Sequence, residues 1–138
     1  MKKILVLCTG NSCRSQIAEG YLRFFAEGRA EVYSAGIIVH GVHPKAIAVM
    51  GEVGIDISMH TSNNIAEYIN VDFDLIITVC DHAKESCPFF PSKAIIFHQN
   101  FPDPAKVKGS EIEILDEFRS VRNLIGKYCE VFIQENLR

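Results

Sequence analysis

A cysteine and an arginine, Cys8 and Arg14, carry the chemistry that this chain most clearly offers. Cys8 directly follows the apolar run 4–7, and Arg14 stands after a loop of small residues, where the next helix is expected to begin. The backbone N–H groups of such a loop can surround a tetrahedral oxyanion. Together with the helix dipole and the guanidinium, they favour the thiolate form of the cysteine. The residues expected to bind the anion are Thr9, Gly10, Asn11, Ser12, Cys13 and Arg14.

The position of Cys8 favours a reactive thiol over an inert one. Free cysteine often behaves as a small hydrophobic residue in a core, but anion sites are built at strand-to-helix junctions such as this one. Arg14 would hold two oxygens of the anion. An ordinary cation in the first helical turn would oppose the helix dipole. Ser15 can either hydrogen-bond the thiolate or cap the helix, and both interpretations remain open.

Asp103 is a candidate general acid. It lies between Pro102 and Pro104, so its backbone is stiff. A rigid carboxyl can protonate a leaving oxygen if it faces the anion site. The alternative is an aspartate that only initiates a turn.

Two further cysteines, Cys80 and Cys87, suggest thiol chemistry beyond a single nucleophile. A straight helix would hold them about 10 Å apart, too far for a disulfide, so a bond between them requires the segment to unwind. The alternatives are two unrelated cysteines and, less favoured by the spacing, zinc.

Cys13 is expected to point toward the sheet, and Cys129 to lie in the core. The histidines, expected at the surface or in caps rather than as ligands, are His40, His43, His60, His82 and His98.

Apolar segments alternate with segments of helical periodicity, which predicts one α/β domain over residues 1–138. We expect a four-stranded parallel sheet with helices on both faces and the phosphate-binding loop after the first strand. Ligands of such sheets bind at the carboxyl ends of the strands, so Cys8, Cys80 and Asp103 would share one edge. The expected strands are 3–7, 31–34, 73–79 and 94–97, and the expected helices are 15–28, 44–53, 61–68 (capped by Thr61 or Ser62) and 111–136.

The composition narrows the class of protein. A chain of 138 residues that is 48% hydrophobic can bury one core. A net charge of -3 argues against nucleic acid as a partner. No run is apolar enough to suggest a membrane span, and the N-terminus does not resemble a signal peptide. Five cysteines, an odd number, fit reduced thiols in a cytoplasmic enzyme better than a secreted disulfide framework.

The stretch 8–19 (CTGNSCRSQIAE), with Cys80, the pair Cys87-Pro88 and the run 103–105, closely resembles the thioredoxin-coupled arsenate reductases. These enzymes share the fold of the low-molecular-weight protein tyrosine phosphatases. The likeness extends over nearly the whole chain, including 33–36, 43–46 and 56–62. The loop motif fits both families, whereas the cysteine pair at this spacing is specific to the reductases.

The resemblance implies a relay of three cysteines. Cys8 would attack arsenate held by the loop and Arg14, and Asp103 would protonate the departing oxygen. Cys80 would then attack the sulfur of Cys8 and release arsenite. Cys87 would move the disulfide to a Cys80–Cys87 pair that thioredoxin reduces. No flavin, nicotinamide or catalytic metal is required, and we expect a monomer.

Two positions depart from related sequences. Phosphatases of the fold usually have an aromatic residue after the Asp-Pro pair, whereas this chain has Ala105, which favours a small inorganic substrate. Some reductases bind a potassium ion through residues that match Asn11, Glu19, Ser34 and an aspartate. Asn63 stands at the aspartate's position and weakens such a site.

Two other functions stay open at this point. One is a low-molecular-weight phosphatase that acts through a phosphocysteine at Cys8, with Cys80 and Cys87 protecting that thiol from oxidation. The other is a non-catalytic module that senses redox state or binds an anion.

Overall fold

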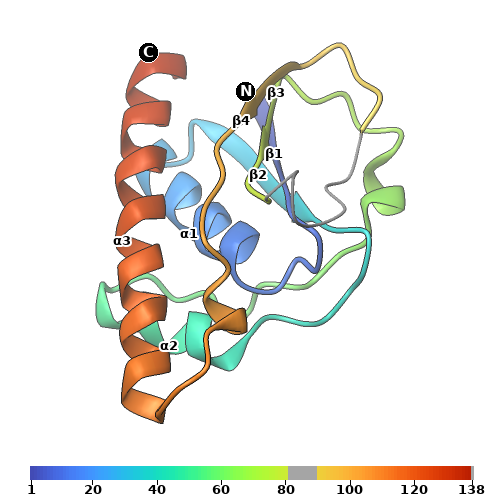
Figure 1. The fold of residues 1–138 in the computed structure, drawn as a ribbon. Helices are drawn as coiled ribbons and strands as arrows, with labels where there is room; N and C mark the ends of the chain where they lie inside the picture. The colour runs from blue at the N-terminus through green and yellow to red at the C-terminus, as the bar shows by residue number, and fades with distance from the viewer. Residues whose placement is uncertain (81–89, 138) are drawn as a thin grey trace.

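The computed structural model describes residues 1–80 and 90–137. Its centre is one sheet of four parallel strands in the order β2-β1-β3-β4 (Figure 1). The strands are β1 (Lys2–Leu7), β2 (Ala30–Ala35), β3 (Leu75–Thr78) and β4 (Ile95–His98). The predicted parallel α/β sheet is therefore confirmed, and β1 lies inside it between β2 and β3.

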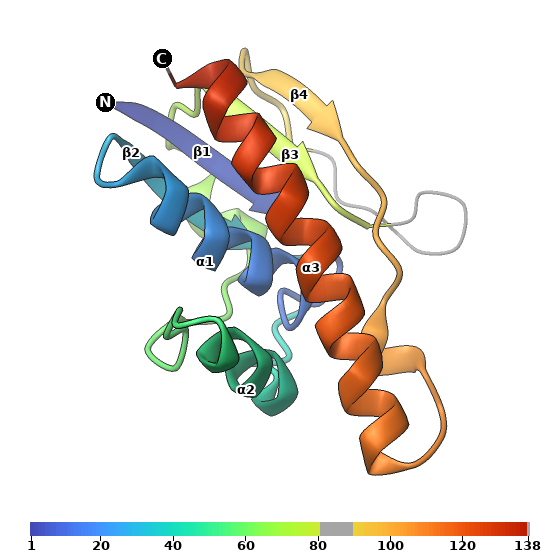
Figure 2. The ribbon, with the colours of Figure 1, turned by 90° about the vertical axis from the view of Figure 1, so that its left-hand side faces the viewer.

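The three α-helices pack against one another, and the first and last of them lie on one face of the sheet (Figure 2). They are α1 (Arg14–Ala26), α2 (Pro44–Glu52) and α3 (Glu111–Asn136). The opposite face is covered in part by the short 3-10 helix η1 (Ile65–Tyr68), whose Ile65 and Tyr68 pack against that side. A second 3-10 turn, η2 (Pro104–Lys106), follows β4.

The apolar run of β1 is unbroken because both of its faces are buried. Ile4 and Val6 belong to the core shared with α1 and α3. Leu5 and Leu7 point to the other face and pack with Phe73. A strand buried on both sides loses the alternation of polar and apolar residues that a half-exposed strand would have.

Side-chain caps mark where α2 and α3 begin. Ser110 and Glu113 form a capping box at the start of α3, which spans the predicted range. The third expected helix was wrong in its start and type: it is only the 3-10 turn η1, capped by Asn64 instead of Thr61 or Ser62. Of the helices in the described residues, none is long and apolar enough to cross a membrane.

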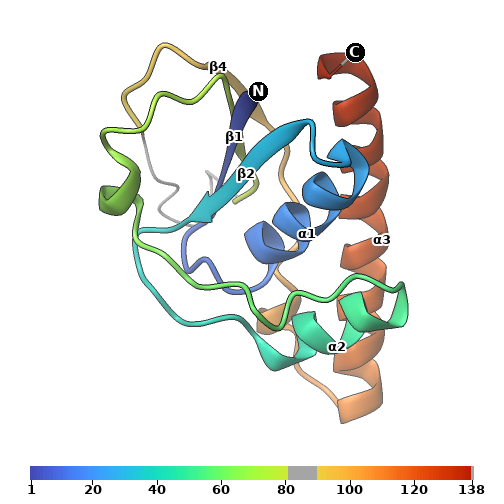
Figure 3. The same ribbon diagram turned by 180° about the vertical axis from the view of Figure 1, so that it is seen from behind.

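The ends of three strands meet at one edge of the sheet. The Cys8 N–H donates to the Ala35 carbonyl at 3.1 Å, and the Val79 N–H donates to the Leu7 carbonyl at 3.0 Å. Since β1 pairs with β3, Cys8 and Cys80 follow neighbouring strands. Figure 3 shows that the connection from β2 to α2 leaves from the same edge.

Candidate active site

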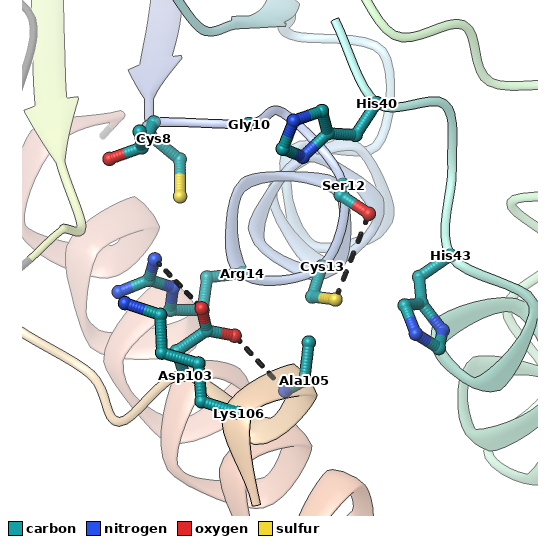
Figure 4. Close-up of a pocket in the computed structure, with 11 residues that line it drawn as sticks. Cys8, Gly10, Ser12, Cys13, Arg14, His40, His43, Asp103, Ala105 and Lys106 are labelled. Carbon is teal, nitrogen blue, oxygen red and sulfur yellow. Dashed lines mark hydrogen bonds and ion pairs between the residues drawn. The ribbon is translucent and has the colours of Figure 1, made fainter. Parts of the chain in front are cut away.

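A pocket of about 380 Å³ opens at the carboxyl end of β1 (Figure 4). It brings together the anion loop, the connection between β2 and α2, and the turn η2 after β4. Asn11, which was expected to bind the anion, does not line the pocket. The lining residues are Cys8, Thr9, Gly10, Ser12, Cys13, Arg14, His40, His43, Asp103, Ala105 and Lys106.

The backbone carbonyls of the anion loop accept hydrogen bonds from neighbouring segments of the chain. The connection between β2 and α2 runs beside the loop and donates backbone N–H groups to it. The pairs are Ile37 N–H and Ile38 N–H to Thr9 (3.0 and 3.1 Å), His40 N–H to Gly10 (3.2 Å) and His43 N–H to Ser12 (3.0 Å). The Asn11 carbonyl accepts from Gln16 Nε2 and Ser62 Oγ. Because carbonyl and N–H groups of an extended loop point in different directions, these bonds leave the loop's N–H groups for an anion.

Three of those N–H groups can still take an acceptor. The N–H groups of Gly10, Ser12 and Cys13 donate to no acceptor within residues 1–80 and 90–137. Buried or partly buried N–H groups of this kind need a partner, and an oxyanion supplies three or four acceptor oxygens. The loop therefore has the polarity of an anion site.

Asn11 holds the loop in shape from behind. Its backbone is left-handed, with φ of 47°, and its side chain is fully buried. Its Oδ1 accepts from the N–H of Asn63 at 2.7 Å. Its Nδ2 donates to the hydroxyl groups of Ser15 and Ser34, at 2.8 and 2.9 Å. Asn11 thus supports the loop. Ser15 accepts a hydrogen bond from Asn11, and its side chain does not cap α1.

Arg14 and Asp103 meet at the pocket, as the chemistry of an anion clamp and acid requires. Arg14 is 3% exposed, donates from Nη1 to the Phe101 carbonyl at 3.3 Å, and lies with Nη2 3.6 Å from Oδ2 of Asp103. The other Asp103 oxygen accepts from the Ala105 N–H at 3.0 Å. In Figure 4 the Cys8 sulfur points toward this pair.

Cys8 and Cys13 are both free thiols at the pocket and differ in setting. Burial, with Asp103 nearby, raises the pKa of the Cys13 thiol to about 12. Cys13 therefore stays protonated at neutral pH and is not a nucleophile. Cys13 lines the pocket as part of the loop that was expected to bind the anion.

Cys80 is fully buried and differs from the other described cysteines. It is part of a disulfide bond, whereas Cys8, Cys13 and Cys129 are free thiols. Cys87, and the expectation that the segment between the two cysteines unwinds, lie outside the described residues. Cys129 is buried in the core, as expected.

The residues that match the potassium site of some reductases, which Asn63 was expected to weaken, do not fit a cation. Glu19 already has three partners: Oε1 accepts from Ser34 Oγ at 2.6 Å, and Oε2 pairs with Arg23 Nε at 2.9 Å and lies 3.6 Å from His60 Nε2. Asn63 turns its Nδ2 toward Glu67, at 3.1 Å. The guanidinium of Arg23 thus neutralises the one carboxylate of the set. Within the described residues there is no cluster of metal-binding side chains.

Three lining residues were not expected from the sequence: His40, His43 and Lys106. His43 does cap α2, in line with the capping or surface role expected of the histidines. Its second location, at the pocket, depends on how the β2–α2 connection lies against the loop. The only sequence signal was its position just before Pro44, which marks a helix start.

Known proteins are similar to this chain over nearly its whole length. The family of low-molecular-weight phosphotyrosine protein phosphatases matches residues 3–138. The arsenate reductase of Halalkalibacterium halodurans is 47% identical over 133 residues, 96% of each chain. The arsenate reductase of Bacillus subtilis strain 168 is 44% identical, again over 96% of each chain.

Solved structures agree with these relatives. An arsenate reductase in the phosphate binding state superimposes with a TM-score of 0.81 and 36% identity, over 98% of each chain. A low-molecular-weight protein tyrosine phosphatase from T. tengcongensis, 22% identical, shares the fold with a TM-score of 0.77 over 98% of this chain and 99% of its own.

Proposed function

Because this chain belongs to the low-molecular-weight phosphotyrosine protein phosphatase family, and within it to the arsenate reductases, we propose that it reduces arsenate to arsenite through Cys8, Cys80 and Cys87, with thioredoxin as reductant. The observation that carries the proposal is the Cys8 thiol, not disulfide-bonded, in an anion pocket at the end of the strand next to the one that leads to Cys80.

The first step is substitution at arsenic. The Cys8 thiolate forms a bond to arsenic, and one arsenate oxygen leaves as water after Asp103 gives it a proton. The loop N–H groups and Arg14 hold the other oxygens. We also assign Ser15 a supporting role, as a hydrogen-bond donor that favours the Cys8 thiolate. Arsenic is still pentavalent after this step.

The second step moves two electrons. The Cys80 sulfur attacks the Cys8 sulfur, and the electron pair of the sulfur–arsenic bond goes to arsenic, which leaves as trivalent arsenite. The two cysteines are oxidised to one disulfide. Their strands are neighbours in the sheet, which supports a direct attack.

The third step frees Cys8. Cys87 attacks the Cys80 sulfur, the Cys8 thiolate leaves, and a Cys80–Cys87 disulfide remains for thioredoxin. After this step Cys8 would be a thiol again and Cys80 part of a disulfide, and this proposal is compatible with the bonding of both residues in the structure. The cytoplasm keeps thiols reduced and is the compartment that we propose for the enzyme.

The pocket supports a small substrate. Ala105 lines it where phosphatases of the fold carry an aromatic residue, so one wall that would hold an aryl group is missing. The phosphatase alternative keeps the same Cys8, Arg14 and Asp103, and it differs in needing neither Cys80 nor Cys87. We propose that no resident cofactor or potassium ion takes part, since Arg23 already neutralises Glu19.

Replacing Cys87 by serine tests the relay. C87S should release about one equivalent of arsenite per chain and then stop, because the Cys8–Cys80 disulfide cannot move on. The wild type should turn over repeatedly with thioredoxin, at equal rates in NaCl and KCl of equal ionic strength. The measurement is arsenite formed per chain against time, with C129S, a core substitution away from the pocket, as control. Repeated turnover by C87S would overturn the relay, and sustained hydrolysis of an aryl phosphate without arsenate reduction would favour the phosphatase.

A further inference from the structure

His43 belongs both to the pocket and to the start of α2. Its side chain lines the pocket with Cys8 and Arg14, and Figure 4 shows it on the side of the pocket opposite Arg14. Its backbone N–H donates to the Ser12 carbonyl at 3.0 Å, which fixes the residue against the anion loop. The proposed relay does not use this side chain.

The helix cap determines where the ring of His43 carries its proton. Nδ1 accepts a hydrogen bond from the Lys45 N–H at 3.1 Å, and therefore has no proton of its own. A neutral imidazole has one N–H, so that proton is on Nε2. Within the described residues, no hydrogen bond or ion pair uses Nε2 of His43, so it can donate to a ligand.

The surroundings keep this ring neutral. Burial is the main cause that lowers the pKa of His43, and the charge of Lys45 acts in the same direction. Asp103 acts against both. From α3, the ring of Phe118 packs against His43 with the two centroids 4.9 Å apart. At neutral pH the pocket therefore gains an N–H donor at this position and no added charge.

We propose that His43 is a substrate-binding residue whose Nε2–H donates a hydrogen bond to an oxygen of the bound oxyanion. Arg14 would hold the anion from one side and His43 from the other, with the loop N–H groups between them. Naming arsenate as that anion rests on the proposed function. The hydrogen bond itself requires only that the pocket bind a tetrahedral oxyanion.

Two substitutions separate the ligand contact from the helix cap. In H43S the serine hydroxyl still caps α2 but cannot reach the position of Nε2. In H43Q an amide N–H returns near the position of Nε2, while a poor N-cap replaces a good one. H43A loses both functions and is the common reference. The backbone N–H that bonds to Ser12 is kept in all three variants.

The readouts are the dissociation constant for inorganic phosphate, measured by calorimetry, and Tm. H43S should bind phosphate about tenfold more weakly, the loss expected for one hydrogen bond to a charged group, with Tm within about 1 °C of wild type. H43Q should lose about 4 °C in Tm with its cap and bind phosphate within about threefold of wild type. Nitrogen-15 NMR should find the His43 proton on Nε2 at pH 7, with its signal shifting when phosphate is added.

Three results would each overturn the proposal. They are a phosphate affinity of H43S equal to that of the wild type, an equal loss of phosphate affinity in H43S and H43Q, and a His43 NMR signal that does not shift when phosphate is added. Phosphate binding needs no turnover, so the two proposals can fail separately. A chain that binds phosphate through His43 but forms no arsenite would contradict the proposed function alone. A chain that reduces arsenate with unchanged phosphate affinity in H43S would contradict the His43 proposal alone.

Discussion

At the scale of single residues, Asp103 has two tasks that use different oxygens of its carboxylate. Oδ1 caps the turn η2 by accepting from Ala105, and Oδ2 lies by Arg14 at the pocket. The cap holds the carboxylate in place, and the second oxygen is the one that can carry a proton to a leaving group. The two tasks can therefore be separated by substitution.

D103N should keep the cap and lose the acid. An asparagine oxygen accepts from Ala105 as the aspartate does, so Tm should stay within about 2 °C. The rate of the first arsenite release should fall by about 100-fold, because no group protonates the departing oxygen. Single-turnover kinetics measure that rate.

Phosphate affinity provides the control for D103N. It should be equal to or tighter than that of the wild type, since one negative charge has left the pocket. D103A, which loses cap and acid together, should also have a lower Tm. An unchanged first-turnover rate in D103N would assign the proton to another group.

At the scale of elements, the anion loop depends on how closely the end of β2 approaches it. A Cβ on Gly36 would lie 2.6 Å from the Thr9 carbonyl oxygen and 2.9 Å from the Asn11 nitrogen. Both atoms are backbone, so the contact cannot be relieved by a side chain turning away. Only glycine allows the segment after β2 to come close enough to donate to the loop.

G36A should therefore damage the site from outside the pocket. We expect phosphate binding to weaken at least tenfold and Tm to fall, because the loop and β2 must move apart. G51A is the matched control: its new Cβ meets nothing within 4 Å in α2, and alanine should hold or raise Tm. Calorimetry and thermal unfolding measure both variants. Equal phosphate affinity in G36A and G51A would show that the loop does not need this approach.

The elements also show what the sequence could predict. α3 begins and ends as expected, because its apolar face is continuous and Ser110 provides a start signal. The helix expected at 61–68 was too long, because a 3-10 turn of four residues is too short to show a helical period in the sequence. Cys8 and Arg14 stand at the two ends of one short loop, so the local sequence pattern was enough to predict that they lie together. His43 and Lys106 come to the pocket from distant segments through long-range packing, which no local pattern encodes.

At the scale of the whole molecule, one carboxylate ties α2 to α3. Glu52, at the end of α2, accepts from Arg119 and Arg122 of α3. The hydrogen bond from Arg119 is the largest cause that lowers the Glu52 pKa, from 4.5 to about 2. A carboxyl with a lower pKa in the folded state stabilises the fold above its unfolded pKa and loses that effect as pH falls.

This linkage predicts an acid-sensitive difference between wild type and E52Q. The urea midpoint of the wild type should exceed that of E52Q at pH 7, and the gap should be full down to about pH 4.5. It should close as pH falls from 4.5 toward 2, where Glu52 takes up a proton in the folded state. Urea titrations at four pH values follow the gap. A gap that stays constant down to pH 3 would mean that the Arg119 contact does not stabilise the charged form.

The outward-facing carbonyls of the anion loop have a consequence for how the protein can vary. Their partners in the β2–α2 connection are backbone N–H groups, and the side chains of Ile37 and Ile38 that belong to them are 38% and 49% exposed. Substitutions at these two positions keep every donor except when proline is introduced. The exposed side chains of this connection can therefore change by mutation while the polarity of the loop stays the same.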